Sequence, residues 1–467
     1  MSKRLWLVLG VIIVAALAGW GINRREKTDQ QTELNSGKKI VVVINCGPKE
    51  TDKVAVKNLK ADIAEFNKIY PNIEIKWTDR GYSPDSFATS IAGGTAEDVI
   101  TLWATEGYVA ERGYAWDLTK MINDWEYKDQ LNMSMLEPFK RNGRYYALPM
   151  SGYIIGMWYN KKIFRDAGLT KGDGSYLVPE NWEEFARTAQ KLTNRKKGIA
   201  GYGIYGKGAY AGWGMLNWVW QAGGDFEKEV GGKWRATFGE SETVKAFEFV
   251  RDLRWKYDCL QPNLLLATQD VWPLFAAGQI AMTNGTNDWT PILINQNGMK
   301  IDEIGMALLP AGPAGRANQL GGDYCIINPN RPQEVQKAAF KWITWKLLKS
   351  VSPEFVKRTG EQMRRQGQVD KISSIPVFTG ELDQKMRQTA QEYRDVLIDF
   401  PGVWQEASKY IKPEPPFFAQ QLYGEYLSPV VQSVLTKEKT NPKQLLQKAA
   451  KSFEERFLNQ GNSRVEE

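Results

Sequence analysis

The stretch Phe275-Ala276-Ala277-Gly278-Gln279-Ile280-Ala281-Met282-Thr283-Asn284-Gly285-Thr286-Asn287-Asp288-Trp289 predicts the end of a helix, a turn, a short strand and a polar loop with one tryptophan. Gly278 suits a helix C-terminus, where a residue with positive φ is favoured. The apolar run 280–282 is short enough to be one buried strand. The loop then offers amides, a carboxylate and an indole, which suit a polar ligand with a flat apolar face. The alternative is that Trp289 is a core residue.

Length and composition indicate a globular protein of more than one domain. The chain has 467 residues, too many for one compact core, and 42% of them are hydrophobic against 25% charged. The net charge of +7 is spread along the chain. A nucleic-acid binder usually concentrates Lys and Arg on one element, so we expect no nucleic-acid partner. The 18 Trp and 19 Tyr offer rings for the core and for stacking on sugar faces.

The sequence contains no histidine, which excludes Ser-His-Asp and Cys-His nucleophilic sites and zinc sites with histidine ligands. Cys46, Cys259 and Cys325 stand far apart and form no Cys-x-x-Cys pair. This spacing favours buried thiols over a metal or redox motif, with one disulfide as the alternative. We therefore expect no cofactor and no resident metal.

The N-terminus predicts export. Lys3 and Arg4 precede the apolar run 5–20, so residues 1–22 form a secretory signal peptide or an uncleaved membrane anchor. Ala16-Leu17-Ala18 suits a signal peptidase, whereas Trp20 stands where a lipoprotein would carry its cysteine. The polar segment 23–39 reads as a flexible tether. We expect an extracytoplasmic location and leave open whether the segment is cleaved.

The next part of the chain alternates strands and helices. Residues 40–44 are β-branched throughout, residues 52–70 carry apolar side chains at helical spacing, and residues 73–77 alternate as a second strand. This is a βαβ unit, and further predicted strands and helices continue the α/β pattern. Asn181, followed by Glu184, predicts the start of another helix.

Several short motifs, taken in order, resemble those of the family 1 extracellular solute-binding proteins, which include sugar-binding proteins similar to the maltose-binding protein. They are Glu97-Asp98-Val99, Gly113-Tyr114-Ala115-Trp116-Asp117-Leu118-Thr119, Asn142-Gly143-Arg144-Tyr145-Tyr146-Ala147-Leu148-Pro149, Trp158-Tyr159-Asn160-Lys161, Pro179-Glu180-Asn181-Trp182-Glu183-Glu184-Phe185, Ala307-Leu308-Leu309-Pro310 and Gly321-Gly322. The opening stretch resembles the segment where that family's chain crosses between lobes and its Trp stacks on sugar.

The resemblance implies a two-lobed α/β fold of the periplasmic-binding-protein type (type II), with crossover strands forming a hinge. From it we predict one lobe from residues 40–148 with 284–328, and another from 149–283 with 329–460. It also implies a monomer that captures a small solute, a sugar first of all, in a cleft between the lobes. The implied partner is the permease of an ABC importer, and the implied activity is binding without catalysis.

Ligands of open α/β sheets bind beyond the carboxyl ends of the strands, and sugar hydroxyls suit Asp, Glu, Asn and Arg beside an aromatic ring. The ligand-binding residues that we predict on these grounds are Trp289, Asp288, Asn287, Asp323, Gly322, Trp103, Glu106, Tyr82, Trp213, Asn217, Trp218 and Arg364.

Each of these residues has a structural alternative. Asp288 can be a solvated turn carboxylate, and Asp323 can satisfy its own backbone in a turn. One ring of the pair Trp213 and Trp218 is expected to face the cleft rather than both. Arg364 can be an ordinary surface residue. The glycines before Asp323 are expected to let the backbone approach a ligand closely.

Two other function classes stay open. Paired carboxylates can hydrolyse glycosides, but no motif here fixes such a pair at a defined spacing. Related folds hold ferric ion on adjacent tyrosines, and Tyr145-Tyr146 is such a pair, although neighbouring residues of a strand face opposite sides. We therefore predict a carbohydrate-binding protein, with binding of another polar solute (a polyamine or metal ion) or carbohydrate hydrolysis as alternatives.

Overall fold

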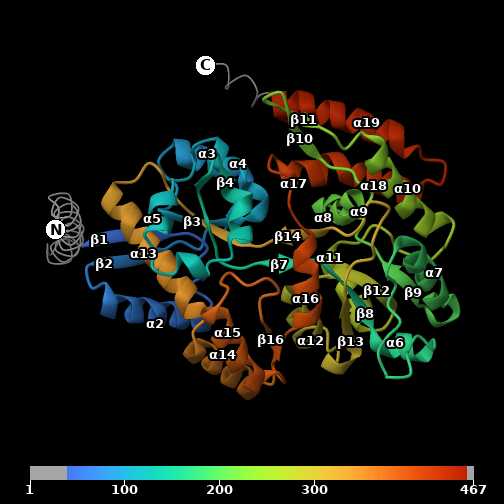
Figure 1. Cartoon of the computed structure of the whole chain (residues 1–467), viewed down its shortest axis with the longest axis horizontal. Helices are drawn as coiled ribbons and strands as arrows, with labels where there is room; N and C mark the ends of the chain where they lie inside the picture. The colour runs from blue at the N-terminus through green and yellow to red at the C-terminus, as the bar shows by residue number, and fades with distance from the viewer. Residues whose placement is uncertain (1–38, 460–467) are drawn as a thin grey trace, which may run out of the picture. The chain divides into compact units, whose positions relative to one another are not determined.

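The computed structural model describes residues 39–459 (Figure 1). Within them the chain forms two compact units: unit one contains residues 39–100 and 330–345, and unit two contains residues 101–329 and 346–459. The predicted signal or anchor, residues 1–22, and nearly all of the predicted tether lie outside the described residues. None of the helices in residues 39–459 is long and apolar enough to cross a membrane.

Unit one begins with the predicted βαβ arrangement. The strands β1 (Ile40–Ile44) and β2 (Ile73–Trp77) pair in parallel, with α2 (Lys53–Ile69) between them in the chain. The Asp52 side chain starts α2 by accepting a hydrogen bond from the Ala55 amide at 2.9 Å. After α3 (Pro84–Ala92), β3 (Val99–Trp103) begins in parallel beside β1. The prediction for this part is confirmed.

Unit one also contains the first part of α13 (Gln333–Ser350). The ring of Phe66 on α2 lies 5.1 Å from that of Trp342 and 5.5 Å from that of Trp345. Arg331 binds Asp98 with 2.6 Å between Nε and Oδ1. The predicted lobes group residues 329–345 with the other half of the chain, whereas these aromatic and ionic contacts hold them against α2 and the start of β3.

Unit two is built on a four-stranded sheet in the order β13-β8-β12-β9. Its strands are β8 (Gly156–Asn160), β9 (Ala200–Gly203), β12 (Ile280–Gly285) and β13 (Ile304–Ala307), all of them buried. Gly278 has φ of 71°, as predicted, and turns the chain from α11 (Thr268–Ala276) into β12. Both β12 and β13 pair antiparallel to β8. The predicted lobes separate 284–328 from this sheet, so the structure groups these strands differently.

Helices surround this sheet in Figure 1. Asn181 starts α7 (Trp182–Leu192) by accepting from the Glu184 amide at 3.0 Å, so this predicted helix start is confirmed. The other helices and the hairpin of this part are α6 (Lys161–Asp166), α8 (Ala209–Trp213), α9 (Leu216–Gln221), β10 (Glu227–Val230) with β11 (Lys233–Ala236), α10 (Ser241–Trp255), α12 (Thr290–Asn295), α16 (Pro401–Ala407), α18 (Ser428–Thr436) and α19 (Pro442–Phe453).

A second sheet of unit two has β14 (Asn318–Gly321) between β7 (Tyr153–Ile154) and β18 (Ile411–Pro413). The stretch 153–160 contains two strands, β7 and β8, which belong to different sheets. After Gly322 the chain continues from β14 into β15 (Asp323–Ile327), which pairs with β6 (Leu148–Pro149). This crossing of sheets brings Ser151–Tyr153 against Gly321–Asp323.

The two glycines before Asp323 are required by this crossing. A Cβ on Gly322, whose φ is 152°, would lie 2.1 Å from the Ser151 carbonyl oxygen, and a Cβ on Gly321 would lie 2.1 Å from the Tyr153 ring. We predicted that these glycines admit a ligand. In the structure the neighbouring segment fills the space, so their smallness serves chain packing.

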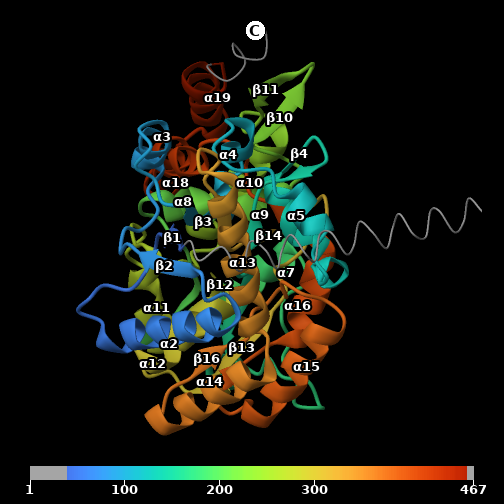
Figure 2. The ribbon, with the colours of Figure 1, turned by 90° about the vertical axis from the view of Figure 1, so that its left-hand side faces the viewer.

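A helical layer follows α13. In both Figure 1 and Figure 2, α14 (Pro353–Gln366) and α15 (Glu381–Ala390) lie side by side. The short strands β16 (Asp370–Lys371) and β17 (Leu397–Ile398) pair in parallel beside them. The layer has its own buried core, which includes Val356, Ile372, Met386 and Leu397.

Candidate functional site

Trp289 ends a short 3₁₀ turn that follows β12, and its ring is partly exposed. Ring centroids of Trp272 and Trp213 lie 4.9 Å and 5.6 Å from that of Trp289. The ring of Trp158, which is fully buried, has its centroid 6.3 Å from that of Trp289. Tyr210 extends the group, with its ring 6.0 Å from that of Trp213 and 42% of its surface exposed. We call Tyr210, Trp213, Trp272 and Trp289 the aromatic wall.

Two carboxylates stand near this wall. The Asp288 side chain is 19% exposed, and its Oδ1 lies 3.8 Å from Lys371 Nζ. Burial raises the pKa of Asp288 to about 6, an effect that Lys371 opposes and that Asp323 and Asp370 reinforce. Asp323 Oδ2 accepts a hydrogen bond from the Ser151 hydroxyl at 3.3 Å. Desolvation by its neighbours also raises the pKa of Asp323.

Tyr153 lies near enough to both carboxylates for their charges to act on its phenol. Burial is the main cause that raises the pKa of its phenol well above the ordinary value. The negative charges of Glu414, Asp288 and Asp323 raise it further, in that order, so the phenol lies within electrostatic reach of all three. The phenol therefore keeps its proton and is available as a hydrogen-bond donor at this site.

Glu414, the third acid whose charge acts on Tyr153, is buried. Its carboxylate accepts from Tyr423 Oη at 2.6 Å and from Gln319 Nε2 at 2.8 Å. Burial raises its pKa to about 7, opposed by hydrogen bonds that include those from Tyr423 and Gln319 and reinforced by Glu106. Asn217 Oδ1 accepts a hydrogen bond from the backbone N–H of Gln319 at 2.8 Å. These bonds hold β14 to α9 and to the segment after β18, which gives Asn217 a supporting role.

Asn287, another predicted ligand contact, is fully buried. Its Nδ2 donates to the carbonyl oxygens of Ile372 and Ile398. These bonds tie the turn before Trp289 to β16 and β17 and thereby bring Lys371 beside Asp288. The structure thus gives Asn287 a positioning role in place of the predicted ligand contact.

Two further predicted contacts have structural roles instead. Trp218 is 1% exposed and packs against Trp182 at 5.8 Å and Phe185 at 5.4 Å, so it belongs to the core. Arg364 lies on the exposed side of α14, where Nη2 binds Asp395 Oδ1 at 2.6 Å and the guanidinium covers the Tyr393 ring at 4.5 Å. We leave both out of the proposed site.

The remaining predicted residues are located as follows. Trp103 is 41% exposed at the end of β3, and the next amide, that of Ala104, donates to the Gly322 carbonyl at 3.0 Å. Tyr82 belongs to unit one, where its ring lies 5.4 Å from that of Phe87. Glu106 is buried and accepts from Thr105 Oγ1 at 2.9 Å.

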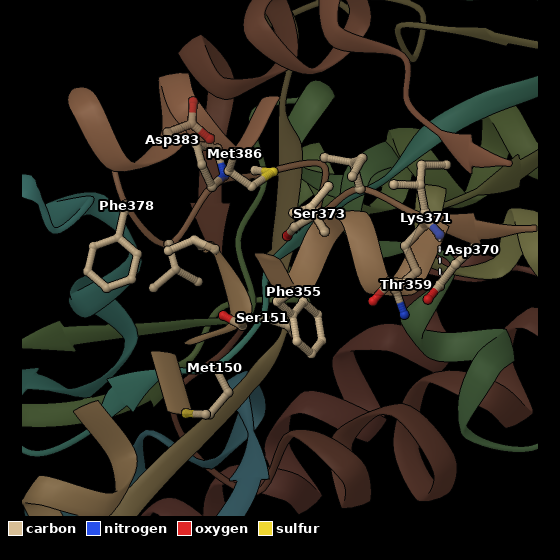
Figure 3. Close-up of a pocket in the computed structure, with 17 residues that line it drawn as sticks. Met150, Ser151, Phe355, Thr359, Asp370, Lys371, Ser373, Phe378, Asp383 and Met386 are labelled. Atoms are coloured by element: carbon tan, nitrogen blue, oxygen red, sulfur yellow. Dashed lines mark hydrogen bonds between the residues drawn. The ribbon is translucent and has the colours of Figure 1, made fainter. Parts of the chain in front are cut away.

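A cavity of about 190 Å³ adjoins the carboxylates. Ser151 and Lys371, which contact Asp323 and Asp288, line it (Figure 3). Most of the other lining side chains are apolar and come from α14, α15 and the segments beside them: Met150, Val351, Phe355, Val356, Ile372, Pro376, Val377, Phe378, Met386 and Leu397. The site therefore combines rings, carboxylates and an apolar recess.

The ligand-binding residues predicted from the sequence do not include Lys371, Glu414, Tyr210, Trp272 or Tyr153. Trp272 could have been predicted from its position, because it lies on α11, the helix that leads into β12. Lys371 lies in the two-residue strand β16 and Glu414 directly follows β18, and only the fold brings these residues to the site.

The chain matches the family model of the bacterial extracellular solute-binding proteins over residues 51–349. That match covers more than half of the chain, and the chain belongs to this family. The resemblance recognised from the motifs is thereby confirmed.

Individual relatives are distant. A binding protein of Brucella abortus (strain 2308) is 27% identical over 267 residues, which are 56% of this chain and 59% of that protein. The chain thus spans about three fifths of the length of this curated relative. The maltotriose-binding protein of Pyrococcus abyssi (strain GE5 / Orsay) is 25% identical over 291 residues, 60% of this chain and 55% of that protein.

Among solved structures, a solute-binding protein of an ABC transporter from Thermotoga lettingae, bound with α-D-tagatose, superposes with a TM-score of 0.63. It is 21% identical, and the match covers 91% of this chain and all of that one. This likeness establishes the fold, the two-lobed α/β fold of periplasmic solute-binding proteins, as the sequence predicted.

Proposed function

We propose that this protein is the extracytoplasmic solute-binding component of an ABC importer and that its solute is a carbohydrate. The observation that carries the proposal is the aromatic wall standing beside Asp288, Asp323 and Tyr153. A sugar has C–H faces that pack on rings and hydroxyls that both donate and accept hydrogen bonds. Ionised carboxylates accept from the hydroxyls, and the Tyr153 phenol donates to them.

Membership of the solute-binding family supports this assignment. One relative described above is named a maltotriose-binding protein, and one of the similar structures was solved with α-D-tagatose bound. We infer that the permease subunits of the importer are the protein partner and that the chain acts as a monomer. The N-terminal apolar segment supports export, as signal or as anchor.

A non-catalytic role follows from the side chains of the site. There is no histidine in the sequence to act as a general base. Asp288 is ion-paired with Lys371, and both oxygens of Glu414 are held by Tyr423 and Gln319. The hydrolase alternative would use Asp288 and Asp323 as the carboxylate pair. Incubation of the purified protein with aryl glycosides tests it, because turnover that is lost in Asp323→Asn would favour the hydrolase.

The solute class is tested by a thermal-shift screen of the purified full-length protein against mono- and oligosaccharides, amino acids, polyamines and metal salts. A ligand that binds the folded state raises the melting temperature by mass action. Stabilisation by saccharides alone supports the proposal. Stabilisation by a polyamine or a metal salt alone would favour the alternative of another polar solute.

A further inference from the structure

We propose that the cavity beside the site receives an apolar substituent of the bound solute, so that the protein prefers glycosides with a small aryl or alkyl aglycone over the unsubstituted sugar. This inference rests on the proposed function, in that the solute is a carbohydrate held at Asp288 and Asp323. It adds the chemical class of the group attached to that sugar.

The size and lining of the cavity suit such a group. Its volume is about 190 Å³. An apolar cavity of roughly 150 Å³ in a protein core stays free of water and binds benzene, so this one has room for a phenyl ring or a short alkyl chain. Figure 3 shows Phe355, Phe378 and Met386 around it. Methionine adapts its shape easily, which suits a wall that packs against a variable group.

Two side chains that line the cavity also contact the carboxylates of the candidate site. Ser151 lines it and donates to Asp323 at 3.3 Å, and Lys371 lines it with Nζ 3.8 Å from Asp288. A group attached to a sugar at these carboxylates reaches the cavity past Ser151 and Lys371. The aromatic wall and the cavity would then hold different parts of one ligand.

The charged residues of the lining have protein partners. Asp383 Oδ1 accepts from Arg387 Nε at 3.0 Å, and Asp370 Oδ1 accepts from the Lys371 amide at 2.8 Å. Lys371 itself faces Asp288. The Asp383 carboxylate and the Lys371 ammonium are thus ion-paired within the protein, and most of the remaining lining is apolar surface.

The test compares two series of ligands on the full-length protein by calorimetry: the methyl and the phenyl β-D-glycosides of glucose, galactose and mannose. For the sugar that binds, we expect the phenyl glycoside to bind at least tenfold more tightly than the methyl glycoside. Thr359→Met places a longer side chain in the cavity from α14, and we expect it to reduce this ratio to less than threefold while methyl glycoside affinity is retained. Lys357→Met, at an exposed position of the same helix, should keep the full ratio.

Benzene provides a measurement that is independent of sugar. It should raise the melting temperature of the wild type and of Lys357→Met but not that of Thr359→Met. Equal affinity for phenyl and methyl glycosides overturns the inference and leaves carbohydrate binding standing. If neither a glycoside nor any saccharide of the thermal-shift screen binds but benzene gives the expected pattern, the carbohydrate proposal fails and the apolar site stands. If benzene also has no effect, both fail. Should Thr359→Met not fold, the wild-type ratio alone decides.

Discussion

Lys371 Nζ lies 3.8 Å from Asp288 Oδ1, directly beside the tryptophan on which solute recognition is expected to depend. The contact joins β16 to the turn after β12, and the hydrogen bonds of Asn287 hold these two segments together. The ammonium opposes the rise that burial imposes on the pKa of Asp288. Lys371 therefore keeps the pKa of Asp288 lower than burial alone would make it.

The first prediction concerns pH and binding. If ionised Asp288 accepts a solute hydroxyl, affinity should fall as the pH drops through about 6, because protonation removes the charge of the acceptor. Replacing Lys371 with Met removes the opposing charge and should shift this midpoint to higher pH. Affinity measured by calorimetry between pH 5 and pH 8, in ~0.15 M salt to screen distant charges, gives the midpoint. An unchanged midpoint in Lys371→Met would contradict the role given to this pair.

The second prediction concerns Trp289. Replacing it with Ala removes a partly exposed ring from the aromatic wall, and we expect a loss of about 1–3 kcal/mol of binding free energy, tenfold or more in affinity. Trp218→Ala is the control, because that ring is buried in the core and its loss should lower stability by about 3–5 kcal/mol without affecting contacts to the solute. Calorimetry and thermal melting of both variants separate the two roles.

If Trp289→Ala retained wild-type affinity and showed a sharply lowered melting temperature, Trp289 would be a packing residue. That outcome is a real alternative, because Trp289 has ring neighbours in Trp158, Trp213 and Trp272.

How far the sequence predicts the site depends on the range of the contacts involved. Gly278, β12 and the turn carrying Trp289 follow from local signals, namely a positive φ, an apolar run and a polar loop. All three are found, but β12 continues to Gly285, three residues beyond the predicted apolar run. The choice between Trp213 and Trp218 could not be made from helical spacing. Helix α8 ends at Trp213 and α9 begins at Leu216, so the two rings are not on one helix.

The contacts of Asp288 and Glu414 depend on tertiary structure. Lys371 reaches Asp288, and Gln319 reaches Glu414, only because unit two brings together segments that are distant in the chain. Gly322 shows the same limit, since its close neighbour is the Ser151 carbonyl rather than a ligand. From the sequence one could predict a close approach at this glycine, but not that the approaching group is the Ser151 carbonyl.

The third prediction concerns stability. Burial raises the pKa of Glu414 from its ordinary value of 4.5 to about 7, so the folded state binds a proton more tightly than the unfolded state. The resulting stabilisation is fully present below pH 4.5 and is lost as the pH rises through about 7. The effect is on the order of 3 kcal/mol.

Glu414→Gln removes the titrating group and should flatten the dependence of the unfolding free energy on pH between pH 4.5 and about 7. Denaturant unfolding at several pH values measures it, with Glu438→Gln as the control on a surface-exposed glutamate. An identical pH dependence in wild type and Glu414→Gln would show that Glu414 is not the group responsible.

The fourth prediction concerns export. With Lys3 and Arg4 before an apolar run, the bulk of the chain should lie outside the cytoplasm. Alkaline phosphatase fused after residue 40 should be active, since that enzyme needs an oxidising compartment. If the fusion is inactive while a reporter that works only in the cytoplasm is active at the same position, export is contradicted. The intact mass of the mature protein distinguishes a cleaved signal peptide from an uncleaved anchor.

The central claim is that the protein binds a carbohydrate at the aromatic wall and the carboxylates beside it. The most direct measurement is a calorimetric titration of the full-length protein with the saccharide that most raises its melting temperature, repeated on Asp323→Asn. We expect saturable binding of one saccharide per chain in the wild type, at least tenfold weaker in Asp323→Asn, with no product released. Saccharide binding that is unchanged in Asp323→Asn, or no saccharide binding while an amino acid, a polyamine or a metal ion binds, would contradict it.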